Sequence, residues 1–392
     1  MGYPWSAIMV GMANTLNRRQ FVAELGFAPF AVEAWAKQAM GRSEWTLFVG
    51  TQTTPGTSKG IYTYTWDAVK GELSGQELAA EVDMPTFLAL APNKKHLYAA
   101  NERPEHGGVT AYAIDGAKLR KINEAPALGS GTCFVSTDHT DQDVFCANYN
   151  SGSMSSFKIR PDGGVEGPVS HEQYHGHGVN PLRQEGPHAH RAIPSPDNRY
   201  VLVNDLGLDC IHIYYLDAAT AKLTPHVPAK WESTPGSGPR ALQFHPNGKW
   251  AYLVCEMESS LSTLHWNAAK GTFHRVQKLS LKPANYNGPI STGCDVIVTR
   301  DGRWAYAANR GYNRLSGYSI NQTNGTLTEI NNIPSGGDIP RFIALDPTER
   351  FLLAANQVSS NIAVFPRNRK TGELSEKGKS YSISRPQCLR FV

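Results

Sequence analysis

Six ionisable residues of this 392-residue chain occupy two equivalent positions in an internal repeat. They are His190, Arg240 and Arg341 at the first position and Glu102, Glu256 and Arg310 at the second. A carboxylate or an imidazole can take a proton from water as a general base. Guanidiniums bind oxyanions through several N–H groups at once. Gathered in one cleft, these groups are suited to the hydrolysis of an anionic substrate.

The repeat that carries these residues consists of short segments typical of strands. Runs rich in Val, Tyr, Leu and Ala recur at intervals of about 46 to 57 residues, as at residues 95–102, 142–149 and 303–310. Turn-forming Pro, Asn, Asp and Gly precede and follow each run, for example at residues 245–248. Each unit therefore predicts four strands, which is typical of a β-propeller blade.

The two ends of the chain predict how the propeller closes. Residues 45–49 and 387–392 each resemble one isolated strand, so together they can complete a blade from both termini. Closure removes the free sheet edges that promote aggregation. We predict an all-β fold over residues 45–392, a seven-bladed β-propeller of four-stranded antiparallel blades whose last blade is closed by the N- and C-terminal strands.

The fold places the ionisable residues around one opening. The first strand of each blade lines the central channel and the second runs antiparallel to it, so the first strand's start and the second strand's end share a face. Sixteen residues separate these positions in six copies, which supports the alignment. The predicted ring contains Thr86, Cys133, His190, Arg240, Cys294, Arg341 and Gln387, with Gln52, Glu102, Tyr149, Leu206, Glu256, Arg310 and Gln357.

Three arginines against two glutamates give this ring a positive surplus, which favours an anionic ligand. Arg240 and Glu256 share a blade and could instead form a structural salt bridge, and His190 could be a buried core histidine. The polar insert at residues 183–190 favours a functional role for His190. We expect His190, Arg240, Glu256 and Arg310 to be catalytic. The predicted substrate-binding residues are Arg341, His188, Glu102, Arg183 and Gln357.

A histidine-rich segment raises the question of a metal. Five histidines fall within residues 171–190, a stretch that includes the polar insert, namely His171, His175, His177, His188 and His190. The last two lie on the same face of a strand, as in some metal sites, but no carboxylate or cysteine completes a known ligand spacing. We therefore predict no metal and no cofactor. The sequence has no GxSxG motif, so a covalent acyl-enzyme is not expected.

Composition excludes several classes of partner. Lys and Arg number 38 against 34 Asp and Glu, a net charge of +4 without basic runs, which argues against nucleic acid or an anionic membrane. The sequence lacks an apolar run long enough to span a membrane. The six cysteines show no CxxC pair and resemble small buried apolar residues. We expect a small anionic substrate and a monomer or weak oligomer.

Residues 1–44 differ from the repeat and form a predicted N-terminal extension. Arg18 and Arg19 precede a moderately apolar stretch that ends with small residues at 34–36. This pattern resembles a twin-arginine export signal with its cleavage site. Export would place the protein in the periplasm or outside the cell. The alternative is a disordered or helical extension on a cytoplasmic protein.

Five segments together resemble one known family: residues 182–190 (LRQEGPHAH), 205–209 (DLGLD), 238–248 (beginning GPR and ending HPNG), 307–311 (AANRG) and 385–388 (RPQC). The chain is similar over residues 45–392 to the seven-bladed propeller lactonases, which include bacterial 6-phosphogluconolactonases and fungal carboxymuconate lactonizing enzymes. The resemblance implies a site of His190, Arg240, Glu256 and Arg310. The repeat alignment selects the same four.

We therefore expect a lactonase that hydrolyses a sugar or sugar-phosphate lactone to the hydroxy acid. Glu256 is the expected general base, together with His190. Arg240 is expected to keep Glu256 ionised or stabilise the oxyanion, and Arg310 with Arg341 to hold a phosphate or carboxylate. The alternatives are a carboxymuconate-type lactonizing enzyme (a cycloisomerase), whose arginines would hold carboxylates, and a non-catalytic propeller scaffold.

Overall fold

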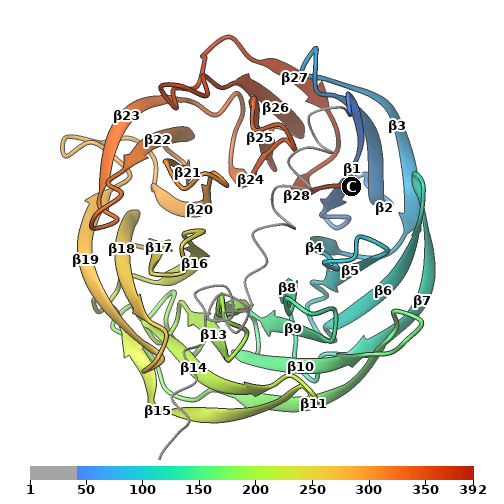
Figure 1. The fold of residues 1–392 in the computed structure, drawn as a ribbon, viewed down its shortest axis with the longest axis vertical. Coiled ribbons are helices and arrows are strands. Elements are labelled where there is room, and N and C mark those ends of the chain that lie inside the picture. The colour runs from blue at the N-terminus through green and yellow to red at the C-terminus, as the bar shows by residue number, and fades with distance from the viewer. Residues whose placement is uncertain (1–41) are drawn as a thin grey trace, which may run out of the picture. The chain divides into compact units, whose positions relative to one another are not determined.

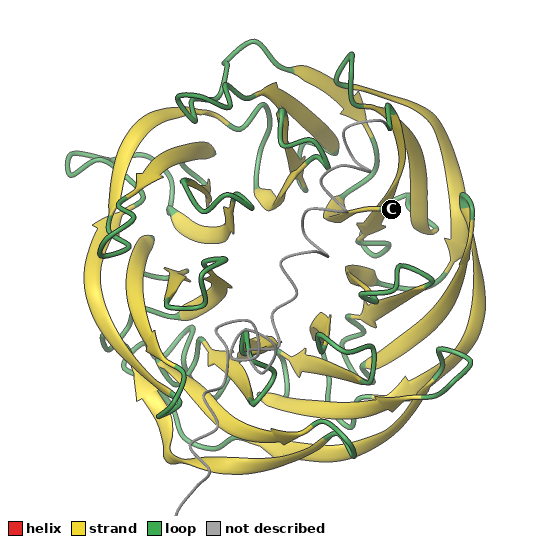
Figure 2. Ribbon diagram, in the orientation of Figure 1, coloured by secondary structure: helices red, strands yellow, loops and turns green. Residues whose placement is uncertain are grey.

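Residues 42–392 are described by the computed structural model, and they form seven four-stranded antiparallel sheets arranged in a ring (Figures 1 and 2). Strands and loops account for all of these residues. Within them, no helix is long and apolar enough to cross a membrane. The predicted all-β, seven-bladed propeller is confirmed.

The blades follow one another along the chain, each running from an inner to an outer strand. Blade 1 contains β28 (Pro386–Phe391), β1 (Glu44–Thr51), β2 (Gly60–Asp67) and β3 (Glu72–Glu81). Blade 2 contains β4 (Pro85–Leu90), β5 (His96–Asn101), β6 (Gly108–Asp115) and β7 (Lys118–Pro126). Blade 3 contains β8 (Thr132–Thr137), β9 (Asp143–Asn148), β10 (Ser153–Ile159) and β11 (Val165–Gln173).

The remaining blades repeat this order. Blade 4 contains β12 (Ala189–Pro194), β13 (Tyr200–Asp205), β14 (Cys210–Asp217) and β15 (Lys222–Glu232). Blade 5 contains β16 (Pro239–Phe244), β17 (Trp250–Cys255), β18 (Ser260–Asn267) and β19 (Thr272–Ser280). Blade 6 contains β20 (Thr292–Val298), β21 (Trp304–Arg310), β22 (Arg314–Ile320) and β23 (Leu327–Pro334). Blade 7 contains β24 (Pro340–Leu345), β25 (Phe351–Asn356), β26 (Asn361–Pro366) and β27 (Lys379–Ser382).

Blade 1 takes its inner strand from the C-terminal end of the chain. Strand β28 pairs antiparallel with β1, with Val49 opposite Leu389, and Figure 1 shows the C-terminus beside these strands. The Nε atom of Arg390 donates a hydrogen bond to the Leu88 carbonyl of blade 2 at 2.8 Å. The closing strand therefore also binds the neighbouring blade. The predicted closure by both termini is confirmed.

The hydrophobic core lies in layers between neighbouring blades. One layer contains Val109 of blade 2 together with Val144 and Phe157 of blade 3, all fully buried. The six cysteines are also buried and carry free thiols. Apolar burial of this kind stabilises a fold by about 25 cal/mol per Å². The packed layers therefore hold each blade at a fixed position around the ring.

A repeated tyrosine contact joins successive blades. The buried Tyr98 hydroxyl of β5 donates to the Gly163 carbonyl in the outer hairpin of blade 3 at 3.0 Å. Tyr252 of β17 makes the same contact with Gly325 of blade 6, also at 3.0 Å. Gly163 has a φ of 85°, and a Cβ there would lie 2.1 Å from the His96 ring. The turn glycines of the outer hairpins thus serve the packing between blades.

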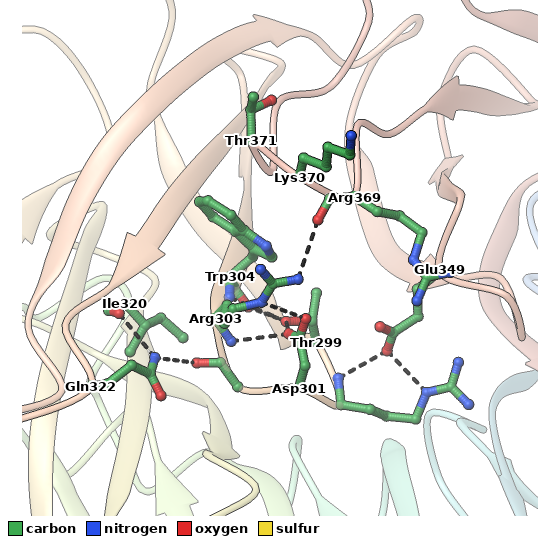
Figure 3. Close-up of polar contacts among 12 residues, drawn as sticks. Thr299, Asp301, Arg303, Trp304, Ile320, Gln322, Glu349, Arg369, Lys370 and Thr371 are labelled. Carbon is green, nitrogen blue, oxygen red and sulfur yellow. Dashed lines mark hydrogen bonds and ion pairs between the residues drawn. The ribbon is translucent and has the colours of Figure 1, made fainter. Parts of the chain in front are cut away.

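Charged turn residues add contacts on the face formed by the turns between first and second strands (Figure 3). Asp301 accepts hydrogen bonds from the backbone N–H and the Nε of Arg303 at 3.0 and 2.8 Å. Arg303 Nη2 in turn donates to the Arg369 carbonyl of blade 7 at 3.3 Å. Arg300 Nε donates to Glu349 of blade 7 at 3.0 Å. These side chains therefore fasten blade 6 to blade 7.

Candidate active site

One residue in each inner strand is skipped by the pairing with the second strand. In blade 5, Pro239 pairs with Cys255 and Ala241 with Val254, which leaves Arg240 without a partner in the ladder. Such a β-bulge redirects the side chain of the extra residue. The skipped residues in the seven blades are Thr86, Cys133, His190, Arg240, Cys294, Arg341 and Gln387. They are the seven first-strand positions predicted for the ring.

The ends of the second strands lie at the same end of the central channel as the bulges, which we call the mouth. A repeated backbone hydrogen bond holds them there. The N–H of Glu256 donates to the Gly238 carbonyl at 2.7 Å, and that of Gln357 donates to Ile339 at 2.9 Å. Gly238 and Ile339 each lie two residues before a bulge and have positive φ values of 68° and 61°. Glu102, Tyr149 and Leu206 make the same bond in their blades. The chain therefore turns sharply at the mouth and presents these side chains there.

Glu256 lies at the centre of a cluster of three arginines. Its Oε2 atom lies 2.6 Å from Arg310 Nη2 and 3.0 Å from Arg240 Nε. Its Oε1 atom lies 2.7 Å from Nη2 of Arg183, which comes from the insert before β12. Arg240 Nη1 also donates to the Cys294 carbonyl. The four predicted residues Arg183, Arg240, Glu256 and Arg310 are thus brought together by blades 4, 5 and 6.

The charges of this cluster set the protonation of Glu256. Only 5% of the residue is exposed, and burial alone would raise its pKa. The Arg310, Arg240 and Arg183 guanidiniums outweigh burial and lower the pKa to about 2. The carboxylate is therefore ionised at neutral pH. Its pairing offsets the cost of burying a charge, and the cluster keeps a net positive charge.

His190 lies beside this cluster as a neutral imidazole. The residue is 7% exposed, and its Nδ1 atom has no hydrogen-bond partner among the described residues. Burial and the charges of Arg240, Arg191 and Arg310 lower its pKa well below the usual range for histidine. The ring of Tyr149 packs edge-on against it, with ring centres 5.8 Å apart. The imidazole is therefore neutral at neutral pH, and the surrounding positive charges oppose its protonation.

His188 is held by the protein instead. Its Nδ1 atom lies 2.9 Å from the Tyr149 carbonyl and its Nε2 atom 3.1 Å from Glu185 Oε1. The imidazole also stacks on the Tyr149 ring at a centre distance of 4.5 Å. His188 thus forms part of the wall beside His190. Its role in substrate binding stays a prediction.

The other predicted binding residues lie elsewhere on the ring. Arg341 Nε donates to Gln387 Oε1 at 3.3 Å, and Gln357 Nε2 donates to Gln52 Oε1 at 2.7 Å. Glu102 forms no ion pair among the described residues, and burial, which outweighs the attraction of Arg240, raises its pKa above the usual range for a carboxyl. Arg341 and Gln357 therefore form a second polar group on the ring, away from Glu256.

Beneath the ring the channel is narrow. A cavity there offers about 10 Å³ to the centre of a water molecule, enough for about one water. It is lined by Thr86, Phe87, Cys133, Phe134, His190, Arg191, Arg240, Arg341, Phe342 and Gln387. Below it, Arg191 Nη2 pairs with the buried carboxylate of Asp295 at 2.8 Å. The sequence alignment missed Arg191 and Asp295, which it would have found by reading one residue past each ring position.

The histidines of the insert do not converge on a shared point. His171 Nδ1 bonds to Ser155 Oγ at 3.0 Å in blade 3, whereas His177 Nδ1 bonds to the adjoining Gly178 carbonyl. Across residues 42–392, no group of three or more His, Cys, Asp or Glu side chains is arranged to hold a metal ion. The predicted export motif at Arg18 and Arg19 lies outside the described residues.

Comparison with known proteins places this architecture in a family. The family model described as "Lactonase, 7-bladed beta-propeller" matches residues 46–391. The chain belongs to the seven-bladed β-propeller lactonase family. The match covers the whole described ring, including the predicted catalytic and binding residues.

Several relatives of this lactonase-family protein are named for one reaction. A 6-phosphogluconolactonase of Bacillus subtilis is 36% identical over 348 residues, 88% of this chain and 97% of that protein. A 6-phosphogluconolactonase of Formosa agariphila is 32% identical and covers 88% of this chain and 99% of its own. The solved periplasmic gluconolactonase of Pseudomonas aeruginosa is 31% identical, with a TM-score of 0.85 over 89% of this chain and 99% of that one.

Proposed function

We propose that this protein is a 6-phosphogluconolactonase-like enzyme that hydrolyses a sugar or sugar-phosphate lactone to its hydroxy acid. One observation carries the proposal. A neutral histidine lies close to Arg240 and Arg310, two of the three guanidiniums that surround a buried carboxylate, at the mouth of a narrow channel. The names of the relatives support the reaction class.

In the proposed reaction, His190 accepts a proton from a water molecule that attacks the lactone carbonyl carbon. The carbonyl oxygen becomes an oxyanion next to the Arg310 guanidinium, whose side chain is 16% exposed. The tetrahedral intermediate then collapses and the ring C–O bond breaks. The proton moves from His190 to the departing alkoxide, which gives the hydroxy acid.

Glu256 was expected to be the general base, but its surroundings favour another role. Both of its oxygens are already paired with guanidiniums, which leaves neither of them free to take a proton from water. We therefore propose that Glu256 holds the arginines in position. An anionic substrate would offset part of their charge, which raises the pKa of His190 and strengthens it as a base.

The binding residues take complementary roles in this scheme. Arg341, which donates to Gln387 on the ring, is proposed to hold the substrate's anionic group at the mouth. Arg183 has a side chain that is 43% exposed, so it is the arginine of the Glu256 cluster that a substrate can reach first. His188, Glu102 and Gln357 are proposed to shape the pocket.

We also propose that residues 1–44 direct export. The periplasmic location named for the Pseudomonas aeruginosa gluconolactonase supports this. A reporter fused to residues 1–44 should reach the periplasm, and the double change Arg18→Lys and Arg19→Lys should keep it in the cytoplasm. Export of the double variant would contradict the twin-arginine assignment.

The proposed reaction can be tested with a panel of lactones. The full chain is incubated with phosphorylated, carboxylated and neutral sugar lactones, and ring opening is measured above the spontaneous rate. We expect turnover that depends on Glu256, with the Glu256→Gln variant as the control. No turnover on any lactone would overturn the proposal. Conversion of a muconate diacid to a lactone would then favour the lactonizing enzyme.

A further inference from the structure

The ring has a second polar group, which contains glutamine and arginine side chains but no carboxylate. It lies where blades 7 and 1 meet and is made of Gln52, Gln357, Gln387, Arg341 and Arg385. Gln52, Gln357 and Gln387 come from the ring positions of their strands, whereas Arg385 lies two residues before the Gln387 bulge. We call these five residues the glutamine–arginine group.

One oxygen atom takes most of the hydrogen bonds within this group. Gln52 Oε1 accepts from Gln357 Nε2 at 2.7 Å, from Arg385 Nε at 2.9 Å and from Gln387 Nε2 at 3.2 Å. A carbonyl oxygen has two lone pairs, so three donors already exceed its usual capacity. Among the described residues, the terminal nitrogens of Arg385 make no hydrogen bond, so they remain available as donors.

Arg341 likewise makes few contacts through its guanidinium. Its Nε atom donates to Gln387 Oε1 at 3.3 Å. In the part of the chain that the structure describes, neither Arg341 nor Arg385 forms an ion pair, whereas Arg183, Arg240 and Arg310 all share Glu256. A guanidinium without a counter-ion in a polar cleft favours an anionic ligand.

The backbone also fixes Arg385 at this place. Its carbonyl accepts the N–H of Gln52 at 3.0 Å, and its φ is 45°, in the left-handed region. A non-glycine residue with positive φ is held there by its surroundings at a cost of about 1–3 kcal/mol. The Cδ atom of Arg385 also lies against Gly56, where a Cβ would approach it to 3.0 Å. The hydrogen bond from Arg385 Nε to Gln52 Oε1 then directs the side chain toward the ring residues.

We propose that Arg341 and Arg385 form the subsite that binds an oxyanion group of the substrate, a phosphate or a carboxylate. The amide groups of Gln357 and Gln387 bind its neighbouring hydroxyls. This inference rests on the proposed lactonase function and deepens it, because it separates anion binding from the reacting centre. The Cys294 thiol of blade 6 donates to the Arg341 carbonyl at 2.9 Å, which ties the subsite to the blade that carries Arg310.

The experiment measures binding of the hydroxy-acid products, so it does not depend on turnover. Calorimetry gives the Kd of the full chain for gluconate, glucarate and 6-phosphogluconate, which differ in the group at the far end. The variants are Arg341→Gln and Arg385→Gln, with Arg369→Gln as the control. Arg369 is exposed in the turn between β26 and β27, at the end of these strands away from the mouth, so its substitution removes the same charge without touching the ring.

We expect the Kd for the product that the subsite prefers, glucarate or 6-phosphogluconate, to rise about 10- to 100-fold in Arg341→Gln and in Arg385→Gln. This is the value for the loss of one or two charged hydrogen bonds. The Kd for gluconate should rise less, and Arg369→Gln should match the unchanged protein. The preference between 6-phosphogluconate and glucarate identifies the oxyanion as phosphate or carboxylate. Equal affinities in all variants would overturn the subsite.

The result also separates the two proposals. Binding that depends on Arg341 without lactone hydrolysis would retain the subsite and remove the proposed reaction. Lactone hydrolysis whose preference for anionic substrates survives both ring substitutions would retain the reaction and remove the subsite.

Discussion

At the scale of single residues, the mouth is governed by an imbalance of charge. Three guanidiniums share the Glu256 carboxylate, and the surplus acts on His190 nearby. Burial and this surplus together keep the imidazole neutral. The same surplus attracts an anionic substrate. One arrangement therefore serves both the protonation state of the base and the choice of substrate.

Removal of one guanidinium should shift the pH dependence in a known direction. In Arg310→Gln, a positive charge near His190 is lost, so the imidazolium forms more easily and the pKa of His190 rises. The base is then protonated at a higher pH, and the acid limb of kcat/KM moves upward in pH. The rate plateau should fall about 100-fold, since an oxyanion donor is lost. The measurement is kcat/KM as a function of pH.

Arg369→Gln is the matched control for this profile, because Arg369 lies in the exposed turn of blade 7. Its profile should coincide with that of the unchanged protein. An acid limb that stays in place in Arg310→Gln would remove His190 as the titrating base.

At the scale of elements, the first strands deliver the site through their bulges. A regular strand would place the ring residue in the ladder, whereas the bulge turns it to the mouth in all seven blades. Buried asparagines at the second-strand ends support this bend. Asn101 Nδ2 donates to the Asp83 carbonyl at 3.1 Å, and its Oδ1 accepts from Thr110 at 2.6 Å.

Loss of such an asparagine should destabilise the blade. Asn101→Ala leaves the Asp83 carbonyl and the Thr110 hydroxyl without partners, so the free energy of unfolding should fall by about 1–3 kcal/mol. Urea denaturation measures the change. Asn285→Ala, at an exposed loop position, should change it by less than about 0.5 kcal/mol. Equal effects of the two substitutions would show that Asn101 does not brace the bend.

The sequence predicts the ring because the blades repeat with a constant spacing. That alignment placed His190, Arg240, Glu256 and Arg310 at one mouth, and the structure brings them together. Arg183 was included without a geometric reason, since it lies in an insert that has no counterpart in other blades. Its reach to Glu256 depends on how that insert folds, and no periodic pattern encodes this.

Arg385 was missed for a related reason. It precedes the ring position by two residues, where four other blades have Met84, Gly131, Gly238 and Ile339, all with positive φ, and the remaining two have His188 and Thr292. Four apolar residues or glycines among these six suggest a structural position, marked by a positive φ and the backbone bond to the second strand. Only the side-chain contact with Gln52 marks Arg385 as a ring residue.

At the scale of the molecule, the two ends of the chain complete one blade. Strand β28 supplies the inner strand of blade 1, Gln387 of the ring and the Arg390 contact to blade 2. Phe391 also packs against the buried Trp66 ring, with centres 5.9 Å apart. The site and the closure of the fold therefore depend on the same strand.

Deletion of residues 386–392 should open the ring. The edge of β1 would lose its partner, and an unpaired edge promotes aggregation. We expect the shortened chain to lose the cooperative thermal transition of the full chain and to aggregate on heating, as measured by circular dichroism and light scattering. An unchanged melting temperature would show that the ring does not need β28 to close.

The most direct test of the account is the rate at which His190→Gln opens the preferred lactone. If the mouth is the active site and His190 takes the proton from water, kcat should fall about 100-fold or more while the melting temperature stays near that of the unchanged protein. Full activity of His190→Gln, with the fold intact, would contradict the account.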